Sequence, residues 1–185
     1  MINQRMYQPY YCEENVWHLC QAQQFHGWDC RVLFITNPMQ CCPLWNQKAA
    51  PKPEHPVVWD YHVVVLASPC GDKGTWQIWD SDSRLGSPVP LNEYLEHTFG
   101  LGTFLENIPE RFRSHFRMVQ AQDFIETFSS DRSHMLSPEG EYFHPPPPWP
   151  AIDQNGPPNL SQFLDVTTPF LGEILDLLAV AAIDQ

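Results

Sequence analysis

Short apolar runs separated by turn-forming residues alternate along this chain of 185 residues, which predicts several short strands and helices. Two of the runs, residues 57–66 and 75–80, are dominated by the β-branched and aromatic residues typical of strands. The connection between them, residues 68–74, is dense in Ser, Pro, Gly and Asp. The two runs therefore predict a β-hairpin.

The predicted hairpin has a histidine on one strand and an aspartate on the other. If its turn is symmetric about Gly71, His62 lies directly opposite Asp80 on the same face. Directly opposed residues have Cβ atoms roughly 5 Å apart, so the carboxylate could orient the imidazole ring. Two alternatives stay open: the pair is an ordinary polar contact on a solvated face, or Asp60, on the same strand face as His62, is the true partner.

Helical spacing appears on both sides of the hairpin. A helix is predicted to begin at Cys12, because Val16, Leu19 and Cys20 fall on one face and acidic residues occupy the first turn. Residues 91–99 predict a second, amphipathic helix. The remaining expected elements are strands at residues 30–36, 42–45 and 111–119 and a short helix at residues 123–128.

Three further segments complete the chain. Residues 1–10 have no periodicity and are expected to form an extended lead-in. Residues 145–150 are nearly all proline and predict polyproline II, either as a ligand for a proline-recognition domain or as a stiff wrap across the surface with its flanking aromatic residues packed inward. Apolar residues within 169–185 predict a C-terminal helix that docks by its apolar stripe.

The length suits one domain, residues 1–185, with a substantial core. Only ten Lys and Arg stand against 22 Asp and Glu, so the net charge of −12 disfavours a nucleic-acid partner and suits a cationic one, such as a free α-amine. No signal peptide and no apolar run of membrane-spanning length is visible, which predicts a soluble intracellular protein. The six cysteines are then expected to be reduced, and without a C-x-x-C pair no metal site is expected.

Cys12 has the most reactive predicted setting of the six cysteines. The unpaired amides and the dipole at a helix N-terminus favour a thiolate, whereas Glu13 and Glu14 oppose a second negative charge and are expected to point away or to serve another task. Most of the other cysteines lie in apolar runs or in a turn, where inert thiols are expected. They are Cys20, Cys30, Cys41, Cys42 and Cys70.

Cys12, His62 and Asp80 follow one another in the order typical of papain-like or transglutaminase-like thiol enzymes. A thiolate attacks a carbonyl, an imidazole moves protons, and a carboxylate fixes the ring's tautomer. Amides at the helix start could stabilise the oxyanion. His134 with Asp131 is the rival acid–base pair.

Four stretches resemble the N-terminal glutamine amidohydrolase family: Tyr-Cys-Glu-Glu-Asn at 11–15, Val-Trp-Asp-Tyr-His-Val at 58–63, Ser-Asp-Arg-Ser-His-Met at 130–135, and the prolines at 145–148. The resemblance covers about residues 11–163 in the same order, and the ending at 172–185 does not look like the family's usual one. It implies a monomeric, cofactor-free enzyme with a three-layer α-β-α sandwich around a mostly antiparallel sheet, similar to the transglutaminase core. It also implies Cys12 as nucleophile, His62 as acid–base and Asp80 as the orienting acid.

The activity implied by the resemblance is hydrolysis of the side-chain amide of an N-terminal Gln to Glu with release of ammonia, feeding the N-degron pathway in the cytoplasm and nucleus. The partner is then the N-terminal segment of a Gln-initiated protein or peptide, with no nucleic acid or membrane involved. Its α-amine needs a counter-charge, and the sequence does not choose among the five available carboxylates, which belong to Glu13, Glu14, Asp60, Asp82 and Asp131. The alternatives are a thiol protease, a transglutaminase, or a non-catalytic adaptor that uses the proline run.

Overall fold

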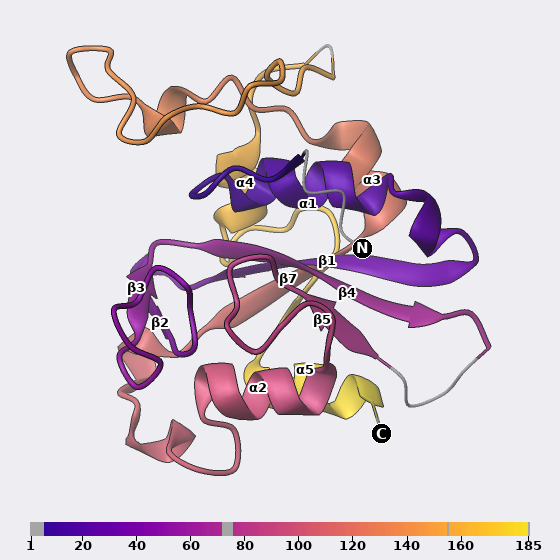
Figure 1. The fold of residues 1–185 in the computed structure, drawn as a ribbon, viewed down its shortest axis with the longest axis vertical. Helices are drawn as coiled ribbons and strands as arrows, with labels where there is room; N and C mark the ends of the chain where they lie inside the picture. Colours follow the sequence, from indigo (N-terminus) through magenta and orange to yellow (C-terminus); the bar gives the residue numbers. More distant parts are fainter. Residues whose placement is uncertain (1–5, 72–75, 155, 185) are drawn as a thin grey trace.

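A six-stranded sheet lies between two groups of helices in this computed structural model, which describes residues 6–71, 76–154 and 156–184 (Figure 1). The strand order is β6-β5-β4-β1-β7-β8, and every pairing within it is antiparallel. The strands are β1 (Trp28–Thr36), β4 (His62–Pro69), β5 (Gln77–Trp79), β6 (Val89–Pro90), β7 (His115–Gln120) and β8 (Glu173–Leu175). The expected mixed fold with a mostly antiparallel sheet is therefore confirmed.

Helices cover both faces of the sheet (Figure 1). On one face lie α1 (Cys12–Cys20), α3 (Ala121–Thr127) and α4 (Leu160–Leu164), and on the other lie α2 (Leu91–Phe99) and α5 (Leu177–Ala181). Successive residues of β4 alternate between the two cores: Val63 and Val65 pack with α1, whereas Val64 and Leu66 pack with α2. Burial on both faces explains why β4 reads as a continuous apolar run.

The two helices predicted with the clearest periodicity form as expected. Helix α1 begins at Cys12 and buries Val16 and Leu19, and α2 spans Leu91–Phe99 and ends at Gly100, whose φ of 71° closes the helix. The strand predicted at residues 111–119 begins later, at His115, after a short 3-10 turn. The 3-10 turns are η2 (Gln23–Phe25), η3 (Leu105–Asn107), η4 (Glu110–Phe112), η5 (Ser133–Met135) and η6 (Ala182–Asp184).

The hairpin differs from its prediction in two ways. Its first strand is interrupted, because β3 (Val57–Trp59) pairs with β2 (Cys42–Leu44) in a separate two-stranded sheet before β4 begins at His62. The register is also shifted by two residues, so that Val65 pairs with Trp79 and β5 ends before Asp80. The assumption of a turn symmetric about Gly71 was therefore wrong, although an even shift keeps the same side chains on each face. Residues 72–75 of the predicted turn lie outside the described residues.

The C-terminal segment was expected to be one helix and is not. Strand β8 extends the sheet beside β7, and only Leu177–Ala181 is helical, with Asp176 capping it by accepting a hydrogen bond from the Ala179 amide. Gly172, with φ of 77°, turns the chain into β8 so closely that a side chain there would meet the Met118 carbonyl. Pairing with an open sheet edge has overridden the helical pattern of the sequence.

The proline run lies against the protein as a wrap. Residues 145–150 form no helix or strand, and Pro147 and Trp149 are buried. Gln8 donates to the Pro145 carbonyl, and Tyr10 stacks on His144 at 3.6 Å between ring centroids, so residues 8–10 lie beside the start of the proline run. Within the described ranges, no helix is both long and apolar enough to cross a membrane.

Candidate active site

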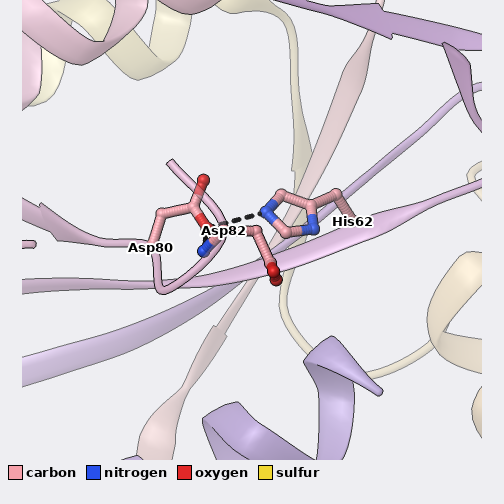
Figure 2. Close-up of side chains that lie close together, drawn as sticks. All are labelled: His62, Asp80 and Asp82. Atoms are coloured by element: carbon pink, nitrogen blue, oxygen red, sulfur yellow. Dashed lines mark hydrogen bonds and ion pairs between the residues drawn. The ribbon is translucent and has the colours of Figure 1, made fainter. Parts of the chain in front are cut away.

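His62 and Asp80 form a buried hydrogen-bonded pair at the end of the β4–β5 ladder. Nε2 of His62 lies 3.0 Å from Oδ1 of Asp80, and neither side chain is more than 2% exposed. Figure 2 shows the imidazole directed at Asp80, with the side chain of Asp82 beside them. Trp59 stacks on the imidazole at 5.7 Å between centroids, which further limits the ring's orientation.

Asp80 is held by three donors besides the histidine. The hydroxyl of Tyr94 donates to Oδ2 at 2.9 Å, the Gln47 amide group donates to the same oxygen at 3.4 Å, and the backbone amide of Asp82 donates to Oδ1 at 2.8 Å. Burial alone would raise the pKa of Asp80, but the charge and hydrogen bond of His62 and these donors outweigh it and lower the pKa. The site therefore holds an ionised carboxylate.

The pKa of His62 changes in the complementary direction. Burial alone would lower it, but the Asp80 carboxylate outweighs burial, with smaller contributions from Asp82 and Glu13, so that the pKa is raised. A carboxylate fixed on Nε2 stabilises the imidazolium form and selects the tautomer in which the neutral ring has its proton on Nε2. The second ring nitrogen, Nδ1, is then the one that can accept a proton.

Cys12 is the first residue of α1 and lies on β4 next to the histidine. Its sulfur accepts a hydrogen bond from the backbone amide of Val63, the residue that follows His62. No side chain caps α1 among the described residues, and the first intrahelical bond is donated by Asn15 to the Tyr11 carbonyl. The amides of the first helical turn are thus available to a developing oxyanion near the sulfur.

The surroundings of Cys12 favour the neutral thiol over the thiolate. Burial raises its pKa well above the usual value, the carboxylates of Glu13 and Asp82 raise it further, and only the Val63 amide opposes them. This setting overrides the helix N-terminus, which was expected to favour a thiolate. Proton removal must therefore accompany attack, which is a task for a general base such as the nearby imidazole.

Glu13 and Glu14, the two acids of the first helical turn, have different tasks. Glu13 faces the sulfur, with Oε2 at 3.7 Å from Sγ, and accepts a hydrogen bond from Tyr61 at 3.0 Å. Glu14 points away from the sulfur, which was one of the two outcomes expected for these acids. It forms a bidentate ion pair with Arg132 at 2.7 and 2.8 Å. The Trp149 indole donates to Glu14 as well, at 2.8 Å. Glu14 thereby ties α1 to the proline run and is already neutralised.

Asp82 lies beside the pair and is bonded to the N-terminal lead-in. The Tyr7 hydroxyl donates to Oδ1 of Asp82 at 2.5 Å. Burial raises the pKa of Tyr7, and the charges of Asp82 and Asp80 raise it further, so this hydroxyl lies close to both carboxylates. Tyr7 thus lies over the site.

Asp60 and Asp131 are exposed and bond within their own loops. Asp60 accepts from the Tyr61 amide at 2.9 Å, and Asp131 accepts from the Ser133 amide at 2.9 Å. Both line a cavity of about 630 Å³ that also includes Tyr61 and His134. Asp80, and not Asp60, is therefore the hydrogen-bonded partner of His62.

The rival groups lack the geometry of a catalytic set. Nε2 of His134 lies 3.3 Å from the Tyr61 hydroxyl and 3.5 Å from Oε1 of Glu13. The Asp131 carboxylate instead accepts a hydrogen bond from the Ser133 amide. Burial raises the pKa of Cys30 and of Cys42 to about 11 and that of Cys20 further still. Within the described ranges, none of the six cysteines is in a disulfide.

His62, Asp80 and Asp82 are also the one group among the described residues whose donor atoms lie close enough together to hold a metal ion, within 4.8 Å of one another. Their hydrogen bonds to one another and to Tyr7 and Tyr94 account for these atoms without an ion.

Several residues of the site were not singled out from the sequence. Tyr61 and Arg132 lie inside the motifs of the resemblance, so they could have been suspected, but Tyr94 read only as part of an apolar stripe. Gln47 and Tyr7 lie in irregular segments with no periodicity. Their contacts depend on tertiary structure.

Comparison with known proteins gives a consistent result. The family model for N-terminal glutamine amidase matches residues 7–182, which includes the C-terminal part where the resemblance read from motifs ended. The protein N-terminal glutamine amidohydrolase of Bos taurus is 37% identical over 166 residues, covering 87% of this chain and 77% of the relative. Those of Homo sapiens and Arabidopsis thaliana are 36% and 38% identical, over 87% and 84% of this chain and 78% and 73% of the relatives. The chain belongs to the N-terminal glutamine amidase family.

Proposed function

We propose that this protein hydrolyses the side-chain amide of an N-terminal Gln in proteins or peptides to Glu with release of ammonia, using Cys12 as nucleophile, His62 as acid–base and Asp80 as the orienting acid. The family membership supports the reaction. The His62–Asp80 bond of 3.0 Å, next to a buried cysteine at a helix start, is the observation that supports the assignment of these residues.

In the first half of the reaction, Cys12 attacks the side-chain amide carbon of the Gln. Because Nε2 of His62 is occupied by Asp80, Nδ1 takes the thiol proton as the S–C bond forms. Free amides of the first turn of α1 stabilise the oxyanion. When the tetrahedral intermediate collapses, the C–N bond breaks and the imidazolium returns its proton to the leaving nitrogen, which departs as ammonia.

In the second half, water hydrolyses the thioester. The same imidazole takes a proton from water as its oxygen bonds to the acyl carbon, and then gives that proton to sulfur as the C–S bond breaks. The product is a γ-carboxylic acid that ionises to carboxylate, and the neutral thiol of Cys12 is restored. No oxidant, reductant or cofactor is consumed.

Finer features of the proposal rest on the family. They are a monomeric enzyme that acts in the cytoplasm and nucleus and supplies N-terminal Glu to the N-degron pathway, and a core of the papain or transglutaminase type. A helix with a terminal cysteine, packed on an antiparallel sheet beside a His–Asp pair, supports the last of these.

Two matched peptides test the reaction. A Gln-initiated peptide should release ammonia and gain the mass of its Glu form, whereas its N-acetylated twin should stay unchanged, because it lacks the α-amine. Equal release from both twins would contradict specificity for the N-terminus. Release of a peptide fragment, or joining to an added amine, would instead indicate a protease or a transglutaminase.

A further inference from the structure

Glu13 differs from the other four candidate counter-charges because one of its carboxylate oxygens is buried and accepts no hydrogen bond from the described residues. Its side chain is fully buried, and Oε1 has no hydrogen-bond partner among the described residues, although Nε2 of His134 approaches to 3.5 Å. An unpaired buried carboxylate oxygen is costly to a protein. A ligand with a positive charge would satisfy it.

The other four carboxylates are already bonded. Glu14 is neutralised by Arg132, Asp82 accepts from Tyr7, and the exposed side chains of Asp60 and Asp131 accept from backbone amides of their own loops. Of the five carboxylates, only that of Glu13 is fully buried, has an oxygen without a hydrogen-bond partner among the described residues, and contacts the Cys12 sulfur.

The two oxygens of Glu13 face different groups. Oε2 lies 3.7 Å from the Cys12 sulfur and 3.0 Å from the Tyr61 hydroxyl, whereas Oε1 lies beside His134. The His134 side chain is 28% exposed and lines the cavity of about 630 Å³, so it contacts both this cavity and the buried Oε1. In an N-terminal Gln, only three carbons separate the α-nitrogen from the side-chain amide carbon, so the group that binds the α-nitrogen must lie close to the nucleophile. Glu13 meets this requirement, because its carboxylate lies next to the Cys12 sulfur.

We infer that Oε1 of Glu13 binds the α-ammonium group of the substrate, and that until the substrate binds, the Glu13 carboxylate keeps the adjacent Cys12 thiol protonated. This inference rests on the proposed function. The bound ammonium neutralises the nearest negative charge to the sulfur, so the nucleophile is activated only when a free N-terminus is in place. An acetylated or internal Gln lacks that charge and leaves the thiol at rest.

The other groups around the thiol determine how much of its protonation depends on Glu13. Asp82 and Asp60 also oppose a thiolate, and the Val63 amide favours one. The remaining ionisable neighbours of Cys12 and Glu13 are His62, Tyr61, Tyr7 and His134. Glu13 has the largest effect among the charged groups, and it is the one whose carboxylate contacts the sulfur.

A pair of peptides and a pair of variants test α-ammonium binding. The peptides are a Gln-initiated one and its analogue in which hydrogen replaces the α-amine. The wild-type protein should prefer the first by about a hundredfold in kcat/KM, and Glu13→Gln should reduce that preference to about tenfold or less. Loss of activity on both peptides by the same factor would overturn the role, because a merely structural residue affects both equally.

Alkylation tests the effect on the nucleophile without any substrate. Iodoacetamide should modify Cys12 about tenfold faster at neutral pH in Glu13→Gln than in wild type, with the exposed Cys70 as the internal reference. Glu126→Gln, the same change on the exposed side of α3, should alter neither measurement. An unchanged alkylation rate in Glu13→Gln would overturn the coupling to Cys12.

A third variant and the wild-type reaction distinguish failure of this inference from misfolding of Glu13→Gln and from failure of the proposed function. Glu13→Asp retains the charge, so it should keep the preference for the free α-amine even if Glu13→Gln does not fold; loss of the preference in a folded Glu13→Asp would overturn the role. If wild type leaves the Gln peptide unchanged, the proposed function fails, whereas the alkylation rates still decide whether Glu13 restrains Cys12.

Discussion

Nε2 of His62 bonds to Oδ1 of Asp80 at 3.0 Å, and this bond leaves Nδ1 as the nitrogen that can exchange a proton with a thiol. Tyr94 and Gln47 hold the other oxygen of Asp80, so the carboxylate cannot turn away from the ring. The imidazole is thereby fixed in orientation and in tautomer before any substrate arrives.

Asp80→Asn should therefore lower kcat by about 10³- to 10⁴-fold, as expected when the orienting acid of a triad becomes an amide. The amide keeps the shape of the side chain but can donate to Nε2, which would place the imidazole proton on Nδ1. Ammonia release from a Gln peptide measures the effect, with circular dichroism to verify the fold. A loss smaller than about tenfold would show that the pair is not catalytic.

The same pair predicts how stability depends on pH. The pKa of His62 is raised from 6.5, so its contribution is complete below that value and is lost as the pH rises through the folded-state pKa. The pKa of Asp80 is lowered from 3.8, so its contribution is complete above that value and is lost as the pH falls through the folded-state pKa.

Urea unfolding of wild type and Asp80→Asn measures this dependence. The difference in free energy of unfolding between them should be largest near about pH 5, where both groups are charged in either state, and should shrink as the pH rises through the folded-state pKa of His62. A difference that stays constant over this range would contradict the ion pair.

Arg132→Met should destabilise the fold by about 3–5 kcal/mol, because it leaves the buried Glu14 carboxylate without its bidentate partner. Urea unfolding gives the free energy. Arg31→Met is the matched control, since it removes a more exposed ion pair with Asp29 and should cost about 1 kcal/mol or less. Equal decreases in the free energy of unfolding of the two variants would mean that the buried Arg132–Glu14 pair stabilises the fold no more than the exposed pair does.

Much of the fold could be predicted, because core-facing residues and turn residues form recognisable patterns within short stretches of the sequence. Residues 91–99 have a clear helical stripe that ends at Gly100, and the centre of β4, residues 63–67, is apolar because both of its faces are covered. The terminal strand β8 could not be predicted, since three residues gain their structure only from the open edge of β7. The pattern of apolar and polar residues within a segment does not show which sheet edge is free to pair with it.

The residues of the candidate site could be named from the sequence, but their geometry could not. His62 and Asp80 were expected as directly opposed residues, yet the ladder is shifted by two residues and Asp80 reaches the ring from beyond the end of β5. The turn length that sets this register is not encoded in strand propensity. The raised pKa of the Cys12 thiol could not be predicted either, because it depends on the burial of the sulfur and on the direction of the Glu13 side chain.

The most direct test of the proposed chemistry compares wild type with Cys12→Ala on one Gln-initiated peptide, followed by mass spectrometry of the peptide and by an ammonia assay. Wild type should convert the N-terminal Gln to Glu with one ammonia released per peptide, and a folded Cys12→Ala should convert none. Conversion by Cys12→Ala at the wild-type rate would show that the nucleophile is elsewhere.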